Sequence, residues 1–261
     1  MTFIDLEGLN ANLAAIRSDY QSKKPFKYVA FERFFFPERA EEIYANYPEI
    51  EYGKWDGTTY VDQKHKFQQT EFTPGSLMDQ VFGELNAPAF LDWLGRLTGF
   101  GEEILGDEDL FGGGLHQSIN GAFLNVHVDY NIHPKTKLHR RLNVLVYMNK
   151  DWKDEYEGHL ELWDLTQGKR DQLGRFAPTF NRCVIFETNE ISFHGHPKPL
   201  KTPQGVNRKS IATYYYTRTR PENEIAEEHN TLYVNTEGIS GQVKRFNSGV
   251  KALLERINGK Q

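Results

Sequence analysis

The chain has 261 residues, of which 38% are hydrophobic and 13% aromatic, enough to build a sizeable core. Wholesale disorder is therefore excluded. The 31 basic and 36 acidic side chains give a formal net charge of −5, so the basic excess of a broad nucleic-acid-binding surface is missing.

The same composition sets expectations for compartment and partners. No apolar run approaches the ~18–20 residues of a membrane span, and the first residues lack the basic start of a signal peptide. The lone cysteine, Cys183, has no second cysteine to pair with. We therefore expect a reducing, cytoplasmic setting with neither nucleic acid nor membrane as partner. The sequence does not indicate an oligomeric state.

The first hundred residues are expected to be mostly helical. In residues 5–20, leucine and isoleucine recur at helical intervals, which predicts an amphipathic helix. Residues 26–31 resemble a short strand, and a proline at position 37 suits the first turn of a helix over 37–45. Residues 76–85 and 87–97 predict two further helices, the second ended by a glycine.

From about residue 109 the pattern becomes that of a β protein. Short β-prone runs alternate with Gly, Pro, Asn and Asp turns, which is typical of antiparallel sheets closed as a sandwich or jelly roll. Residues 241–257 carry apolar side chains at helical spacing and predict a C-terminal helix. Without a visible linker, we expect one domain over 1–261: helical support in 1–108, a β-core in 109–220, and an extension with a helix in 221–261.

A possible metal site begins with His127 and Asp129. On a strand, residues i and i+2 point to the same face, about 6–7 Å apart along the chain. An imidazole and a carboxylate placed in this way can hold a divalent metal, but His-x-Asp alone is more often a satisfied or solvated pair.

A third ligand is expected from the segment around His194 and His196. Two histidines and one carboxylate would form a facial triad with open coordination positions, as non-haem Fe(II) requires. A closed zinc site would need a fourth ligand, usually cysteine. We prefer His194, because His196 precedes a proline and more plausibly shapes the site. The remaining candidates are His116, His133, His139 and His159; of these we expect His133 and His139 to be solvated.

A strand from residue 207 onwards carries Arg208 and Ser210 on one face. A guanidinium grips a carboxylate through two hydrogen bonds, and a hydroxyl adds a donor. A buried Arg is costly unless an anion neutralises it. A surface Arg at a strand start remains the plain alternative, but the order of all three elements favours an anion site.

The segment from His127 to Tyr216 resembles the Fe(II)- and 2-oxoglutarate-dependent dioxygenases. The shared pattern is His-x-Asp, a distal His, and Arg-x-Ser. The stretch from Arg141 to Trp152 is similar to the prolyl 4-hydroxylase-like branch, in which a strand ends in Tyr-Leu-Asn and a Trp follows a few residues later. The resemblance implies a double-stranded β-helix (jelly-roll, cupin-like) core, with the N-terminal helices packed on one face and a C-terminal helix.

The resemblance also implies roles for individual residues. His127, Asp129 and His194 would be the Fe(II) ligands. Arg208 would hold the distal carboxylate of 2-oxoglutarate with help from Tyr147, and Ser210 is a weaker candidate. The candidates for contact with the substrate are Gln117, Asn125, Tyr130 and Trp163.

One feature of the sequence departs from many relatives, and another distinguishes hydroxylating from halogenating relatives. Glu157-Gly158 stands where relatives have Gly-Gly, which should bend the start of the next strand less freely. A halogenating relative would need the position of Asp129 vacated for a halide, so its presence favours hydroxylation.

The function implied by the resemblance is hydroxylation of an unactivated C–H, with 2-oxoglutarate and O₂ as co-substrates. A prolyl residue in a protein or peptide fits the branch. A free amino acid, a sugar or another small metabolite is the alternative substrate. Outside oxygenase chemistry, two readings stay open: a non-catalytic cupin-like metal- or ligand-binding module, and a zinc or manganese hydrolase or isomerase.

Overall fold

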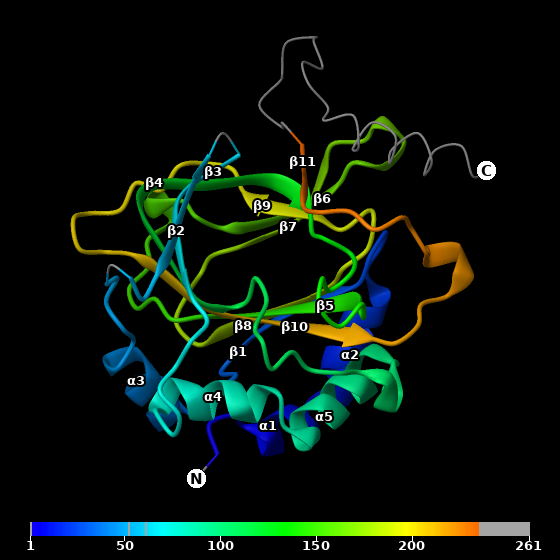
Figure 1. Cartoon of the computed structure of the whole chain (residues 1–261), viewed down its shortest axis with the longest axis horizontal. Helices are drawn as coiled ribbons and strands as arrows, with labels where there is room; N and C mark the ends of the chain where they lie inside the picture. Colours follow the sequence, from blue (N-terminus) through cyan, green and yellow to red (C-terminus); the bar gives the residue numbers. More distant parts are fainter. Residues whose placement is uncertain (1, 52, 61, 235–261) are drawn as a thin grey trace.

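Antiparallel strands form the centre of the molecule in the computed structural model, which describes residues 2–51, 53–60 and 62–234 (Figure 1). The strands are β1 (Tyr28–Glu32), β2 (Asp56–Tyr60), β3 (Gln63–Gln69), β4 (Gly114–Val128), β5 (His139–Tyr147), β6 (Leu160–Asp164), β7 (Asp171–Phe176), β8 (Arg182–Glu187), β9 (Phe193–His196), β10 (Arg208–Thr217) and β11 (Leu232–Tyr233). The helices are α1 (Leu6–Ala11), α2 (Leu13–Ser22), α3 (Pro37–Ala45), α4 (Leu77–Leu85) and α5 (Pro88–Thr98).

The strands follow one hydrogen-bonded path, β1-β8-β5-β10-β4-β9-β6-β7. Strand β3 also pairs with β4, β2 pairs with β3, and β11 pairs with the end of β4. In Figure 1, β1, β8, β5 and β10 form a lower wall, while β4, β9, β6 and β7 form an upper wall. The path curls into a nearly closed antiparallel barrel, so the expected mainly β, jelly-roll architecture is confirmed.

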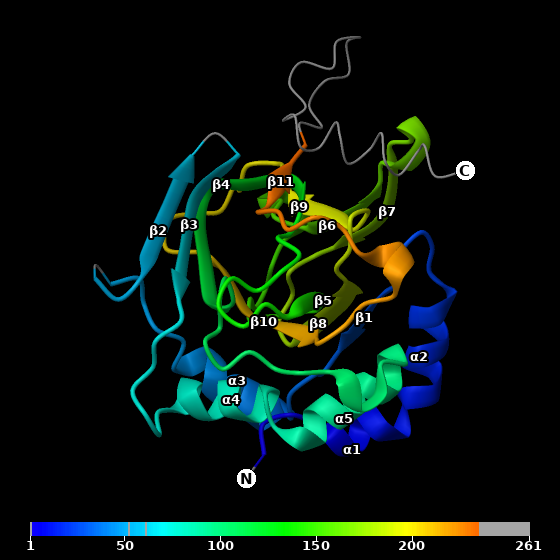
Figure 2. The same cartoon turned by 45° about the vertical axis from the view of Figure 1, so that its right-hand side comes forward.

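All five helices lie on one side, against the outer face of the lower wall (Figures 1 and 2). Helices α4 and α5 bury one apolar stripe each, and these stripes join the largest core cluster together with residues of β5, β8 and β10. The Ser76 side chain caps α4 by accepting a hydrogen bond from the Asp79 backbone N–H. Gly99 ends α5 in the left-handed conformation, with φ +90°.

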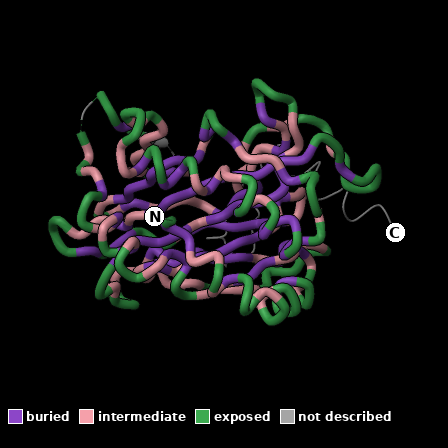
Figure 3. Tube along the Cα trace, turned by 90° about the horizontal axis from the view of Figure 1, so that it is seen from below, coloured by how far each residue is buried: buried purple, intermediate pink, exposed green. Residues whose placement is uncertain are grey.

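Figure 3 shows the buried residues concentrated along the strands, while most exposed residues lie on peripheral loops. Both faces of the lower wall are covered, one by the helices and the other by the upper wall. Among the described helices, none is long and apolar enough to cross a membrane.

The first hundred residues differ from the sequence prediction in two ways. The helix expected over 5–20 is broken at Asn12, whose φ of −101° and ψ of 1° separate α1 from α2. The hairpin β2–β3 was not predicted, because its sequence is polar and lacks a two-residue apolar alternation. It stands at the side of the barrel beside β4 (Figure 2). The helix predicted over 241–257 lies outside the described residues.

Candidate metal centre and active-site pocket

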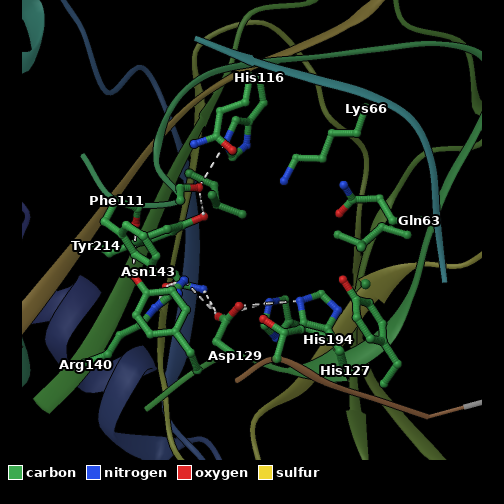
Figure 4. Close-up of a pocket in the computed structure, with 18 of the residues that line it drawn as sticks. Gln63, Lys66, Phe111, His116, His127, Asp129, Arg140, Asn143, His194 and Tyr214 are labelled. Carbon is green, nitrogen blue, oxygen red and sulfur yellow. Dashed lines mark hydrogen bonds and ion pairs between the residues drawn. The ribbon is translucent and has the colours of Figure 1, made fainter. Parts of the chain in front are cut away.

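A cavity of about 520 Å³ opens between the two walls and the β2–β3 hairpin. This volume is in the range of small-molecule sites. The hairpin supplies side chains from β3, and the walls supply side chains from β4, β5, β6, β9 and β10. The segment before β11 contributes to the rim. Figure 4 shows several of these side chains converging on the open space.

His127, Asp129 and His194 come together at one end of the cavity (Figure 4). His127 on β4 and His194 on β9 are direct cross-strand partners. The Nε2 of His127 lies 3.5 Å from Oδ1 of Asp129, and the Nε2 of His194 lies 3.4 Å from its Oδ2. The three ligand atoms are all within 4.8 Å of one another.

Hydrogen bonds fix both imidazoles with Nε2 facing the centre of this cluster. The Nδ1 of His127 is 2.8 Å from the carbonyl oxygen of Asn125, and the Nδ1 of His194 is 2.9 Å from that of Ser192. A carbonyl can only accept, so Nδ1 donates and Nε2 keeps its lone pair. Burial lowers the pKa of His194 to about 4, which keeps this ring in the neutral, metal-binding form at pH 7.

Asp129 is held by a cation and an amide. The side chain of Asn143 donates to its Oδ2 over 2.8 Å, and Nη2 of Arg140 lies 3.0 Å from the same oxygen. The Arg140 guanidinium is sandwiched between the rings of Tyr130 and Tyr214, at 4.4 and 3.5 Å from their centroids. Burial raises the pKa of Asp129, but the opposing effects, of which the Arg140 charge is the largest, hold it well below the ordinary value.

This donor set fits a mononuclear iron site. Two imidazole nitrogens and one carboxylate oxygen would occupy one side of the ion, and the other side faces the cavity, where co-substrates can reach it. Among the residues that the structure describes, no fourth ligand joins this cluster, and Cys183, the lone cysteine of the sequence, is not a member of it. A structural zinc site would need four ligands, usually including cysteine thiolates. When bound, Fe(II) would supply the oxygen-dependent C–H chemistry.

Arg208 and Tyr147 form the second functional element of the cavity. Nε of Arg208 donates to the carbonyl oxygen of Gly158 over 2.7 Å, and Nη2 donates to the Tyr147 hydroxyl over 3.3 Å. Burial raises the pKa of Tyr147, so its O–H remains a donor. Ser210, the cross-strand partner of Tyr147, also lines the cavity. A guanidinium fork and hydroxyls arranged in this way can bind a carboxylate.

The backbone just before β6 brings the carbonyl oxygen of Gly158 within hydrogen-bond distance of Arg208. A Cβ at Gly158 would lie 2.3 Å from Leu200 Cδ2 and 3.1 Å from Arg208 Cδ, and its φ is +73°. The preceding Glu157 adopts φ 58° and ψ −149°, a conformation normally reserved for glycine. The backbone at Glu157-Gly158 is therefore sharply bent, although a glutamate takes the first position.

Several other residues singled out in the sequence fall at or near the cavity. His116, His196 and Tyr130 line it. His196 follows His194 by two positions on β9 but is not part of the three-ligand group. Burial lowers the pKa values of His116 and His196 well below the ordinary value, so both are neutral at pH 7.

Three of the proposed substrate-side residues lie outside the cavity lining. Gln117 donates to the carbonyl oxygen of Pro48, because the alternation of β4 turns its neighbours inward and Gln117 outward. Asn125 donates to Asp62, and Trp163 packs in a small apolar cluster on the far face of β6.

His133, His139 and His159 are not metal ligands of this cluster, and the expected solvation of the first two is wrong. His133 is buried and His139 half-buried. His159 is buried beside Asp154.

His133 belongs to a second group of possible ligands with Asp107 and Asp109. Two backbone N–H groups donate to its Nδ1, so the Nε2 of the neutral ring carries the proton. Lys135 also pairs with Asp109 at 2.7 Å. Unlike His127 and His194, His133 therefore does not present a free Nε2 lone pair to a metal ion.

Sequence reasoning missed Lys66, Gln63 and Arg140, which all line the cavity. Lys66 and Gln63 lie on the unpredicted hairpin. Counting back from Tyr147 in steps of two along β5 reaches Asn143 but skips Arg140. The register of β5 against β10 is irregular near Tyr216, and this irregularity lets Arg140 face the cavity as well.

The match to a known protein family covers the β-core. Residues 113–216 match the model of the 2OG-Fe(II) oxygenase superfamily. No curated protein matches the sequence.

Solved structures share the fold at low sequence identity. A Pseudomonas putida prolyl-4-hydroxylase has 18% identity and a TM-score of 0.50, over 79% of this chain and 100% of the other. A Trichoplax adhaerens prolyl hydroxylase, bound to a hypoxia inducible factor peptide fragment, has 15% identity and a TM-score of 0.58, over 81% and 93%. A Phytophthora capsici prolyl 4-hydroxylase has 16% identity and a TM-score of 0.55, over 99% and 77%.

The matched segment contains His127, Asp129, His194, Arg208 and Tyr147, the residues that build the cluster and the carboxylate-binding end of the cavity. The β-core over residues 113–216 is therefore a 2OG-Fe(II) oxygenase superfamily domain.

Proposed function

We propose that this oxygenase hydroxylates a prolyl residue in a protein or peptide. The observation that carries the proposal is one cavity holding a two-histidine, one-carboxylate cluster at one end and the Arg208–Tyr147 pair in the same enclosed space. The resemblance of the segment from Arg141 to Trp152 to prolyl hydroxylases supports the substrate class. So does the similarity in fold to prolyl hydroxylases, one of them bound to a peptide.

The proposed overall reaction balances simply. 2-Oxoglutarate and O₂ react with R–H to give succinate, CO₂ and R–OH, so one oxygen atom enters succinate and the other the product. His127, Asp129 and His194 would hold the iron that supplies this oxidising chemistry. Arg208 and the protonated Tyr147 would fix the distal carboxylate and thereby orient the co-substrate.

The remaining pocket residues would position the substrate and keep the site dry. Arg140 and Asn143 orient the Asp129 carboxylate through its Oδ2. Phe111 and Tyr214 lie beside Arg140 in Figure 4, and Tyr130, whose ring is 4.4 Å from the Arg140 guanidinium, lines the same cavity. An aromatic wall suits the puckered, apolar pyrrolidine ring of a prolyl residue, and we propose that the substrate lies there.

A free amino acid or another small metabolite is the alternative substrate, and the cavity volume admits it as well. A non-catalytic module would not require a buried arginine fork aimed into the same cavity as the metal ligands. We further propose a cytoplasmic location, in keeping with a lone, buried Cys183.

The test is a screen of the Fe(II)-loaded enzyme with 2-oxoglutarate and O₂ against proline-containing peptides and free metabolites. The expected result is a mass gain of one oxygen on a prolyl residue, matched by release of one succinate. Mass gain on a free metabolite, with none on any peptide, would overturn the peptide substrate. The control is the His194→Ala variant, which should give neither product.

A further inference from the structure

Lys66 reaches the active-site cavity from the hairpin that covers β4. Its cross-strand partner is Ser118, and the partner of Ser118 on the next strand is Arg208. All three line the cavity, so they form one inward-facing row across β3, β4 and β10. Figure 4 shows the Lys66 side chain extending into the open space, with Gln63 on one side and the metal ligands beyond.

A backbone irregularity turns Lys66 inward. Lys64 and Lys66 would share a face on a regular strand, but the register of β3 against β4 shifts between them and His65 has φ +52°. Lys64 consequently lies exposed, while Lys66 is half-buried at the cavity. Strained positions of this kind are found preferentially at functional sites.

The Lys66 ammonium has no anionic partner in the cavity. Among the residues that the structure describes, no carboxylate lies within ion-pair distance of its Nζ. The acids that line the cavity are Asp129 and Glu228; Asp129 is paired with Arg140, and Glu228 with Lys137 at 2.9 Å. Loading the site does not supply a counter-charge, because the +2 of Fe(II) and the −2 of 2-oxoglutarate cancel.

Burying the Lys66 ammonium without a counter-charge is energetically unfavourable. Burial, together with Arg208 and Arg140, lowers the pKa of Lys66 to about 8, although Asp129 acts in the opposite direction. The other titratable groups that face it are His116 and His196, which are neutral at pH 7. A polar neutral side chain would avoid this cost, so the position of Lys66 calls for an anionic ligand.

We propose that Lys66 is a substrate-binding residue that selects an anionic substrate, one that carries a carboxylate or phosphate group near the C–H to be hydroxylated. The inference rests on the proposed function and narrows its substrate class. The Arg208–Tyr147 pair is reserved for the co-substrate, and Lys66 lies two strands away in the same row, so the two anions are bound by different cations.

Acetylation of lysine amines tests this directly. The wild-type protein is saturated with Mn(II) and 2-oxoglutarate, treated with an amine-acetylating reagent at pH 8, and each lysine is followed by peptide mass spectrometry. A parallel sample carries Mn(II) without 2-oxoglutarate. The additions compared are N-acetyl-L-proline, the uncharged N-acetyl-L-prolinamide, and inorganic phosphate. The first and third separate a carboxylate from a phosphate as the preferred anion, and exposed Lys64 is the internal control.

We expect at least one of the two anions to slow acetylation of Lys66 about tenfold, while the amide leaves it unchanged and Lys64 is unaffected throughout. Protection by the amide as strong as that by the acid, or no protection by either anion, would overturn the proposal. Protection by 2-oxoglutarate alone, before any addition, would assign Lys66 to the co-substrate and would overturn it as well.

Variants give a second, independent readout. Calorimetric binding of the protecting anion to the Mn(II)–2-oxoglutarate form should weaken about 10- to 100-fold in Lys66→Met, the loss expected for one charge-assisted hydrogen bond, and recover in Lys66→Arg. Lys64→Met, the matched control on the same strand, should bind like wild type. Loss of 2-oxoglutarate affinity in Lys66→Met would contradict the assignment. Neither measurement needs turnover, so failure of the hydroxylation screen and failure of this proposal can be told apart.

Discussion

The Arg208→Met substitution separates co-substrate binding from metal binding. Arg208 is buried, and its Nε is already engaged by the Gly158 carbonyl at 2.7 Å. Nη2 donates to the Tyr147 hydroxyl over 3.3 Å, but the two terminal nitrogens carry four N–H groups, so others remain for the proposed distal carboxylate of 2-oxoglutarate. Methionine keeps much of the stem and removes the fork, so little empty space is created.

The size of the effect follows from the lost hydrogen bonds. Two hydrogen bonds to a carboxylate contribute about 1.5–3 kcal/mol each, about 3–6 kcal/mol together. The 2-oxoglutarate dissociation constant should therefore rise about 10²- to 10⁴-fold. Fe(II) affinity without 2-oxoglutarate should stay within about twofold, since Arg208 does not contact the metal ligands. Tyr147→Phe, which removes one neutral hydroxyl, should raise the constant only about fivefold.

The assay is an anaerobic titration of 2-oxoglutarate into the Fe(II)-loaded protein, followed by the visible charge-transfer band of the complex. Circular dichroism of each variant verifies folding, because the Gly158 carbonyl loses its donor in Arg208→Met. An unchanged midpoint in this variant, or an equal loss of iron and 2-oxoglutarate binding, would refute the role given to Arg208.

Three further predictions follow from the same geometry. Gly158→Ala should raise the 2-oxoglutarate dissociation constant and lower the free energy of unfolding by about 1–3 kcal/mol, because its Cβ would press on Leu200 and Arg208 at a φ of +73°; isothermal titration and urea unfolding check this, and wild-type values for both would contradict it. Asp129→Asn should abolish stoichiometric Fe(II) binding and also destabilise the metal-free protein by about 3–5 kcal/mol, because the buried Arg140 loses its carboxylate; unchanged iron binding in equilibrium dialysis would mean that another carboxylate is the ligand. Lys66→Met should stabilise the protein by about 1–2 kcal/mol at pH 7, a value discounted for the partial exposure of Lys66. The pKa of Lys66 is lowered on folding, so the penalty is complete below pH 8 and fades toward pH 10.5; a gain that grows with pH in urea unfolding would disprove this explanation.

Much of the metal site could be predicted because strand alternation and metal chemistry act over short sequence distances. His127 and Asp129 share a face by a two-residue step, and the choice of His194 over His196 agrees with the geometry of the cluster. Strand alternation likewise turns Arg208 and Tyr147 into the same cavity.

The substrate side could not be predicted because it depends on which strands become neighbours. Gln117 is adjacent to His116 and Ser118 in sequence, yet its direction is fixed by pairing with Lys209, the outward neighbour of Arg208. Lys66 needed both an unpredicted hairpin and a register shift at His65 to enter the cavity. The burial of His133 likewise depends on the rings of Phe111 and Tyr216, which are distant from it in the chain.

The central claim is that one metal ion is bound by His127, Asp129 and His194. Anomalous diffraction from crystals grown with Mn(II) tests it most directly, because manganese replaces Fe(II) without oxidising and its position is read without reference to activity. A single anomalous peak at bonding distance from both Nε2 atoms and the Asp129 carboxylate is the predicted result. A peak at Asp107, Asp109 and His133 instead, or none at the first cluster, would contradict the account.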